Sequence, residues 1–220
     1  MTEYAIVHKN RVILGPVSWS QKYFKTVLKV RHRIDANNIP VNAPSELPLE
    51  IDADTKIHAV TEVRPEFNPM VEYLQGPIWD FTNDVIVANY NVLDIPIENA
   101  RQNFRDLAAL ERYKKEEAGT TTTLQDTEIF LDTSREGRNI FLQKYLLMGD
   151  EDVINWKFPQ AWLSITKEEL GFVIFVGSSW IQAAFDWEKD INDQINAAET
   201  KEQLLAIEIV EESDEEELND

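Results

Sequence analysis

Four carboxylates crowd into one short stretch near the C-terminus, and grouped carboxylates can act as general acids or bases or hold a hard cation. The stretch is AAFDWEKDINDQI, residues 183–195, and it contains Asp186, Glu188, Asp190 and Asp193. Two interpretations compete for it. It is either an acidic active site or the solvated side of a helix with one acid out of place.

The helical period decides between these interpretations for three of the four acids. At about 100° per residue over 167–198, Asp186, Asp190 and Asp193 fall together on one side. Polar residues gather in this way on the solvated face of an amphipathic helix. The apolar stripe on the other side consists of Leu170, Val173, Ile174, Gly177, Trp180, Ile181, Ala184, Ile191, Ile195 and Ala198. These three acids therefore predict a surface and not an active site.

Glu188 differs because its angle falls inside the apolar stripe, between Ala184 and Ile191. A buried, ionised carboxylate is costly unless it is paired and hydrogen-bonded. Glu188 is then either a catalytic group tuned by burial or half of a structural ion pair, and we favour the ion pair. An arginine from the helix predicted at 97–117 or at 134–148 would be its partner. The arginines in or beside these helices that we consider are Arg112, Arg135 and Arg138.

Other residues that could carry chemistry are missing or poorly spaced. The chain has no cysteine, which excludes disulfides, thiolate zinc sites and a cysteine nucleophile. The three histidines, His8, His32 and His58, fall in three different predicted elements. No glycine spacing matches a phosphate-binding loop, and the serines of GSSW, 177–180, lie inside a helical pattern. We predict a protein that is not an enzyme and that has no cofactor and no metal site.

Charge and hydropathy narrow the classes of partner. The net charge of −19 argues against nucleic acid, because cationic contacts to phosphate carry that kind of binding. The last ten residues, EESDEEELND, predict a disordered acidic tail over 211–220. No secretory signal is visible, and the longest apolar run, LGFVIFVG at 170–177, is shorter than the ~18 residues of a spanning helix. We therefore expect a soluble protein with no membrane partner.

The first half, residues 1 to about 95, predicts a mainly β module with one helix. Apolar runs flank Lys9-Asn10 as in a β-hairpin. Ser18 and Gln21 have the spacing of a capping box, which would start a helix ending near Arg33. The apolar stripe expected on that helix includes Trp19, Tyr23, Val27 and Val30. An extended loop over 35–54 and three strands over 56–63, 70–79 and 84–92 complete the module.

The second half, 96–210, predicts a helical domain with a small antiparallel sheet, so that the fold class is α+β. A helix over about 97–117 should end at Gly119, and a hairpin should turn at Gln125-Asp126. VINWKF predicts a strand. Capping-box spacings start at Thr133, at Thr166 for the long helix, and at Thr200 for a short last helix.

The helix predicted at 134–148 is apolar nearly all round, and such a helix must be covered on more than one side. This pattern predicts contacts beyond the domain itself. The candidate interaction residues are Phe141, Tyr145, Met148 and Trp187.

Several separated motifs of the second half occur in an order that resembles a domain-of-unknown-function family of tailed bacteriophages. The motifs are RYKKEEAG, IFLDTSREGRNIF, INWKFPQAWLSITKEEL and QAAFDWEKDINDQINAAETKEQLLAIEI. The likeness covers about 97–209. It departs at LGFVIFVG, where the family leads us to expect a smaller, more alanine-rich helix. The first half is similar to short β modules that precede such domains in phage tail proteins.

The resemblance implies a function but transfers no catalytic residue. It implies a structural component of the virion, an adaptor or accessory protein at the tail tip, baseplate or fibre attachment point. The alternative is a tail-fibre assembly chaperone, and an anti-host factor that mimics nucleic acid ranks last. The implied partners are other tail or fibre proteins, with self-association left open. The implied location is the virion tail, after assembly in the host cytoplasm.

Overall fold

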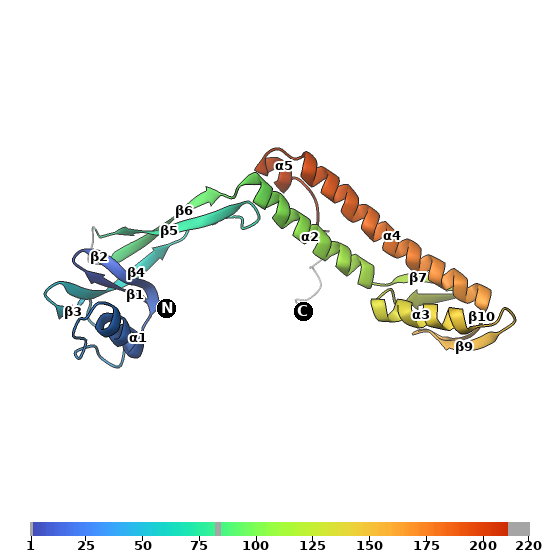
Figure 1. The fold of residues 1–220 in the computed structure, drawn as a ribbon, viewed down its shortest axis with the longest axis horizontal. Coiled ribbons are helices and arrows are strands. Elements are labelled where there is room, and N and C mark those ends of the chain that lie inside the picture. The colour runs from blue at the N-terminus through green and yellow to red at the C-terminus, as the bar shows by residue number, and fades with distance from the viewer. Residues whose placement is uncertain (1, 82–84, 211–220) are drawn as a thin grey trace, which may run out of the picture. The chain divides into compact units, whose positions relative to one another are not determined.

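The computed structural model describes residues 2–81 and 85–210 and divides the chain into two compact units, Met1–Ile95 and Pro96–Asp220 (Figure 1). The first is mainly β, and the second is helical with two small antiparallel sheets, which confirms the expected α+β class. The predicted acidic tail at 211–220, and Asp84 at the start of one predicted strand, lie outside the described residues.

A six-stranded sheet forms the first unit. Its order is β2-β1-β4-β6-β5, with β3 also paired to β4, and only the β4–β6 pair is parallel. The predicted hairpin at Lys9-Asn10 is confirmed, because both residues have positive φ, the conformation of a tight two-residue turn. The strands are β1 Glu3–His8, β2 Arg11–Ser18, β3 Leu49–Asp52, β4 Thr55–Val63, β5 Glu72–Asp80 and β6 Ile86–Asp94.

The helix of the first unit starts later than predicted, and only part of its predicted apolar stripe faces the core. It consists of α1, Gln21–Thr26, and a π-helical turn, η1, Val27–Arg31. Ser20 caps it, whereas Ser18 belongs to β2. The Gln21 side chain instead donates to the Ile39 carbonyl oxygen at 2.7 Å. The predicted capping box is therefore wrong.

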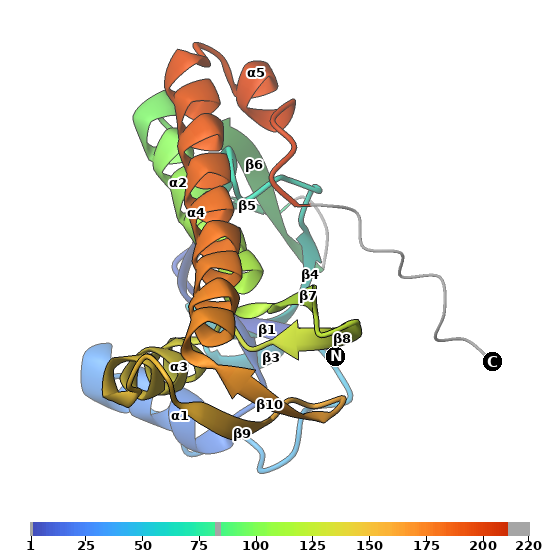
Figure 2. The ribbon, with the colours of Figure 1, turned by 90° about the vertical axis from the view of Figure 1, so that its right-hand side faces the viewer.

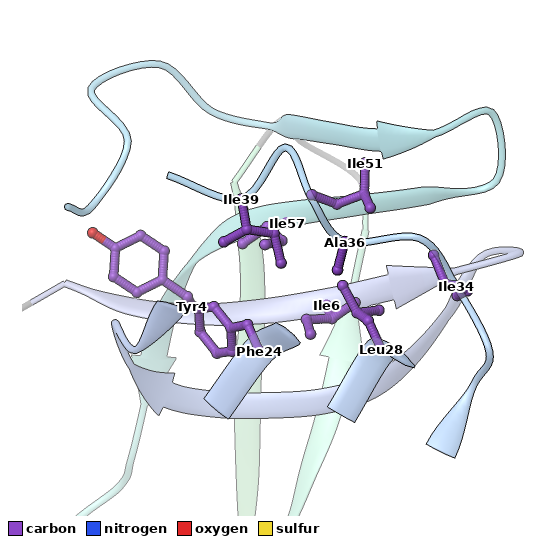
Figure 3. Packing of buried hydrophobic residues seen from close by; sticks show 9 residues of the cluster. All are labelled: Tyr4, Ile6, Phe24, Leu28, Ile34, Ala36, Ile39, Ile51 and Ile57. Carbon is purple, nitrogen blue, oxygen red and sulfur yellow. The ribbon is translucent and has the colours of Figure 1, made fainter. Parts of the chain in front are cut away.

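The buried side of this helix carries Phe24, Val27 and Leu28. Of the predicted stripe, Val27 is buried and Trp19 packs against the core, whereas Tyr23 and Val30 are exposed. Part of the predicted 35–54 loop closes over the same core, since Ile39 and Ile51 are buried there and residues 49–52 form β3. Figure 3 shows this cluster, which consists of Tyr4, Ile6, Phe24, Leu28, Ile34, Ala36, Ile39, Ile51 and Ile57.

Two long antiparallel helices, α2 (Ile97–Glu117) and α4 (Lys167–Ala197), form the main body of the second unit (Figures 1 and 2). The predicted capping boxes at Thr166 and Thr200 are both present, and they start α4 and the short helix α5, Lys201–Leu205. Gly119 follows the C-cap of α2 with a φ of +80°, as predicted. A Cβ there would lie 2.1 Å from the Phe130 ring, so only glycine fits this position without a shift.

The first half of α4 packs against a small mixed layer of one helix and two hairpins. The helix is α3, Arg135–Leu147, and the hairpins are β7 (Thr120–Leu124) with β8 (Thr127–Leu131) and β9 (Val153–Lys157) with β10 (Trp162–Thr166). Figure 2 shows α3 and the β7–β8 hairpin on opposite sides of this part of α4. The turn at Gln125-Asp126 and the strand from VINWKF were predicted, but β10 was not. The fully or nearly buried residues of this core are Leu124, Ile129, Leu131, Met148, Phe158, Ile165, Leu170 and Val173.

The start and the surroundings of α3 correct two predictions. Ser134 caps the helix by accepting from the Gly137 N–H at 3.1 Å, and Thr133 does not form the predicted capping box. Within α3, only Gly137 is fully buried. Leu147 is 82% exposed, and Ile140, Leu142 and Leu146 are also exposed. The described chain thus covers α3 on one side, although its sequence predicts cover on more than one.

Candidate protein interface

A cluster of four charged side chains with alternating sign links α2, α3 and α4. Glu116, only 3% exposed, lies between two arginines. Arg138 Nη2 donates to its Oε1 at 2.6 Å, and Arg112 Nη1 pairs with its Oε2. Arg112 Nε also donates to Glu188 Oε2 at 3.0 Å. Each charge therefore faces an opposite one, which is the condition for keeping such groups away from water.

Glu188 is the acid that the helical period places inside the apolar stripe, and its partner is one of the three expected arginines, Arg112. Its side chain keeps 21% of its surface exposed, so it is half-buried and not enclosed. Asp186, Asp190 and Asp193 are exposed, as the period predicts. The four acids of residues 183–195 are thus three exposed residues on the solvated face of α4 and one, Glu188, that is paired with an arginine of α2.

The enclosed acid, Glu116, was missed by sequence reasoning. It sits in the charged segment RYKKEE, where nothing in the hydropathy pattern separates it from Glu117. The available signal was its spacing of four residues from Arg112, which places the two side chains together on one helix face. The contact with Arg138 joins α2 to α3, and only the tertiary structure shows it.

Thr133, just before α3, forms hydrogen bonds with the backbone at the end of α2. Its hydroxyl donates to the Glu116 carbonyl oxygen at 2.6 Å and accepts from the Gly119 N–H at 3.0 Å. Because these contacts use backbone groups at a helix end, they replace the partners that the helix itself cannot supply. The polar cluster at this junction is internally satisfied, an arrangement that favours a structural role.

An apolar cleft of about 240 Å³ lies between α3 and α4. Asp132, Thr133, Arg138 and Ser178 contribute polar groups to its lining. The rest of the wall is largely hydrocarbon, so a cleft of this size suits one or two apolar side chains of a partner. The apolar lining residues are Leu131, Phe141, Leu142, Val173 and Ile174.

The first half of α4 turns a second apolar surface towards solvent. From Leu170 to Phe185 the sequence contains no charged residue. The buried side accounts for part of this run, but Phe175 is 68% exposed and Phe172 and Trp180 are also exposed. We call the residues Phe172, Phe175, Val176, Trp180 and Ala183 the outer face of α4. Of these, Val176 is half-buried and also packs against the core of the unit, and the Trp180 indole N–H donates to the Lys115 carbonyl oxygen at 2.9 Å.

Exposed leucines of α3 adjoin this outer face. The Tyr145 ring packs so close to Gly171 that a Cβ there would lie 3.2 Å from it, so α3 rests on the Gly171 side of α4. Phe175 is one turn further along that side. Leu142 and Leu146 flank Tyr145 on α3 and are exposed. Leu142 also lines the cleft, so apolar side chains are present on both of its walls.

The four predicted interaction residues have different positions. Phe141 stacks on Trp156, with ring centroids 5.0 Å apart, and still lines the cleft. Tyr145 is half-buried against α4, and Trp187 is half-buried with Lys115 Nζ 5.0 Å from its ring centroid. Met148 is only 5% exposed and belongs to the core, so its prediction as a contact residue is wrong. Sequence reasoning missed Leu146, Leu147 and Phe175, although the charge-free run was visible.

The N-terminus of α4 is fixed by its capping box. Glu169 Oε2 accepts from the Thr166 N–H at 2.8 Å, and Gln125 Nε2 donates to Glu169 Oε1 at 2.8 Å. The Thr166 N–H above all, and the Gln125 amide after it, lower the pKa of the Glu169 carboxyl group. The charged carboxylate therefore stabilises the start of the helix that carries the outer face.

By length and composition alone, α4 is long and apolar enough to cross a membrane. The uninterrupted apolar run at 170–177 did not predict this, because small polar residues divide the apolar residues of α4. One such helix is weak support for a membrane span, since core helices of other proteins pass the same test. Among the described residues, no three His, Asp or Glu side chains are placed to hold a metal ion.

A family model described as a domain of unknown function, DUF4376, matches residues 99–211, which is half of the chain. The chain belongs to this family. The expectation of an uncharacterised domain in the second half is thereby confirmed, whereas its association with phage tails stays a prediction. No curated protein and no solved structure gives a significant match.

Proposed function

We propose that this protein is a structural component of a bacteriophage tail, an adaptor or accessory protein that acts through protein–protein contacts. The observation that carries the proposal is the exposed, charge-free outer face of α4, in a domain whose motif order resembles phage tail proteins. A charge-free stretch with several exposed aromatic rings is typical of an interaction site.

The polar cluster supports this proposal in a second way. Arg112, Glu116, Arg138 and Glu188 pair among themselves, and Thr133 is occupied by backbone groups. These contacts hold α2, α3 and α4 in a fixed arrangement. A rigid support is what an apolar contact surface needs if its affinity is not to be lost to ordering costs.

Mass spectrometry of purified phage particles tests the proposal. We expect peptides from both units of this chain in particles that have been freed of host protein by density-gradient banding. A soluble protein of the same infected lysate, followed through the same gradient, serves as the control. Presence in the lysate together with absence from the particles would overturn the proposal.

The strong negative charge favours a second candidate, a tail-fibre assembly chaperone. A net charge of −19 would help to keep an aggregation-prone client in solution. Co-expression with a tail-fibre protein separates the two functions. A chaperone raises the soluble yield of the fibre protein, whereas an adaptor only binds fibre protein that is already folded.

A further inference from the structure

The first half of α4 breaks the pattern of an amphipathic helix. Leu170, Val173 and Ile181 face the core, yet the opposite side also carries large apolar residues. A helix that is apolar all round is normally buried. In the apolar window of α4, only 17% is buried within the described chain. No described residue of the second unit covers this face.

The exposed area is large enough for a stable contact. If a large side chain presents about 200 Å² when fully exposed, then Phe172, Phe175 and Trp180 together show roughly 300 Å². The exposed parts of Leu142 and Leu146 on α3 add roughly 200 Å², for a total of roughly 500 Å². A standard interface buries about 800 Å² per partner, of which roughly 60% is apolar. The apolar surface therefore matches one side of a standard interface.

The chemistry of the face indicates what covers it. Because it contains no charge, a charged partner surface would lose its hydration there and gain no ion pair in return. The best match is another charge-free apolar face, and each copy of this chain carries one. Phe172, Val176, Ser179 and Ala183 are spaced four, three and four residues apart, as in a helix–helix contact seam, and the last two are small enough for close approach.

We propose that the outer face of α4 packs against the same face of a second copy of this chain. In such a two-fold contact each copy offers the same surface to the other. Asp186 follows Ala183 at the next position of the seam, so acids would meet if the helices ran in parallel and in register. The two helices therefore cross near Val176 and Ser179, and the contact ends before the acids. This holds whether or not the protein is part of a virion.

Light scattering coupled to gel filtration tests the proposal on the full chain. We expect twice the chain mass for the wild type. Phe175→Glu, which places a charge in the contact, should weaken dimerisation by at least about tenfold, the effect of losing one central aromatic anchor. Asn99→Glu is the matched control, because it adds the same charge at an exposed position of α2 and should leave the dimer intact. A wild type that is monomeric at every concentration, or a dimer that Phe175→Glu does not weaken, overturns the proposal.

The absence of cysteine allows a second test that needs no disruptive change. A disulfide forms only when the two Cα atoms lie within about 7 Å. We expect mild oxidation to link Val176→Cys or Ser179→Cys into a covalent dimer, whereas Asn99→Cys should stay monomeric. Failure of both positions to crosslink above the Asn99→Cys background would contradict the crossing near these residues.

Flotation with neutral phosphatidylcholine vesicles tests a lipid surface as the alternative cover. We expect the wild type to stay with the soluble fraction. If it floats with the vesicles, and Phe175→Glu abolishes this while Asn99→Glu does not, the outer face belongs to a lipid surface and the proposed self-contact is wrong.

Discussion

Glu116 and Glu188 both face Arg112, but their surroundings predict different costs of removal. Glu116→Ala leaves Arg112 and Arg138 without their shared buried partner, and we expect a loss of about 3–5 kcal/mol in the free energy of unfolding. Glu188→Ala leaves Arg112 still paired with Glu116, so about 1–2 kcal/mol is expected. Asp186→Ala, on the wet face, should change stability by no more than about 0.5 kcal/mol. Urea unfolding of the three variants measures these differences.

The ranking of these variants matters more than any single value. Equal, small effects of the first two would mean that the alternating cluster does not hold the three helices together. A loss for Glu188→Ala that matches the loss for Glu116→Ala would mean that Glu188 is far less solvated than its exposure indicates.

Glu169 makes the stability of the second unit depend on pH at the acidic end. Its pKa is lowered in the folded protein, so the charged carboxylate contributes stability above the pKa of the unfolded chain, about 4.3. This contribution is lost as the pH falls through the lower folded value. We expect the wild type to be more stable than Glu169→Gln at neutral pH, and the difference to shrink as the pH drops below about 4. Thermal melts across that range measure it, and a difference independent of pH would contradict it.

For individual residues, the sequence predicted the Arg112–Glu188 half of the charged cluster and missed Glu116. The helical period separated Glu188 from the three wet acids and pointed to an arginine on a facing helix. It could not separate Glu116 from Glu117, because burial there depends on where α3 returns to the end of α2. The predictions of capping boxes were also only partly correct. Thr166 and Thr200 matched, but Thr133 is occupied by the Glu116 carbonyl oxygen and the Gly119 N–H.

At the scale of elements, the two consecutive residues at the end of α3 face in opposite directions. Met148 is in the core and Leu147 is the most exposed of the large apolar residues described. Met148→Ala should cost about 2–5 kcal/mol, the usual range for truncation in a core. Leu147→Ala should stay within about 0.5 kcal/mol. Chemical unfolding of both variants tests the orientation of α3, and similar losses for the two would contradict it.

Elements with a clear turn or helix-end signal in the sequence were predicted correctly, and elements without one were missed or misplaced. Both two-residue turns, the end of α2 at Gly119 and the full length of α4 follow from local chemistry. The strand β10 was missed because the segment PQAWLSIT is short and leads directly into the capping box of α4. The stripe of α1 was only partly right, because the buried Phe24 and the exposed Tyr23 are adjacent in sequence and the prediction chose Tyr23.

At the scale of the whole molecule, each unit has its own core. The buried cluster around Phe24 lies in the first unit and the one around Phe158 in the second. We expect a fragment of residues 96–220 to fold alone, with the circular dichroism spectrum of a largely helical protein and a cooperative melt. A fragment that melts without cooperativity would contradict two independent units.

Composition and periodicity predicted the α+β class, because the first half alternates in short runs and the second half has long helical stripes. They could not show which apolar side chains stay uncovered. For α3, the sequence predicted cover on a second side, and the described chain leaves that side open. Exposure of this kind depends on how the elements pack in three dimensions, which the sequence pattern alone does not show.

We propose that this domain acts through the apolar surface of α3 and α4 in an assembled phage tail. Reconstruction of the virion by electron microscopy at side-chain resolution tests it most directly. We predict density for this chain in the tail, with Phe172, Phe175 and Ala183 covered by protein. A tail without the chain, or one that contains it with the outer face of α4 open to solvent, would contradict the account.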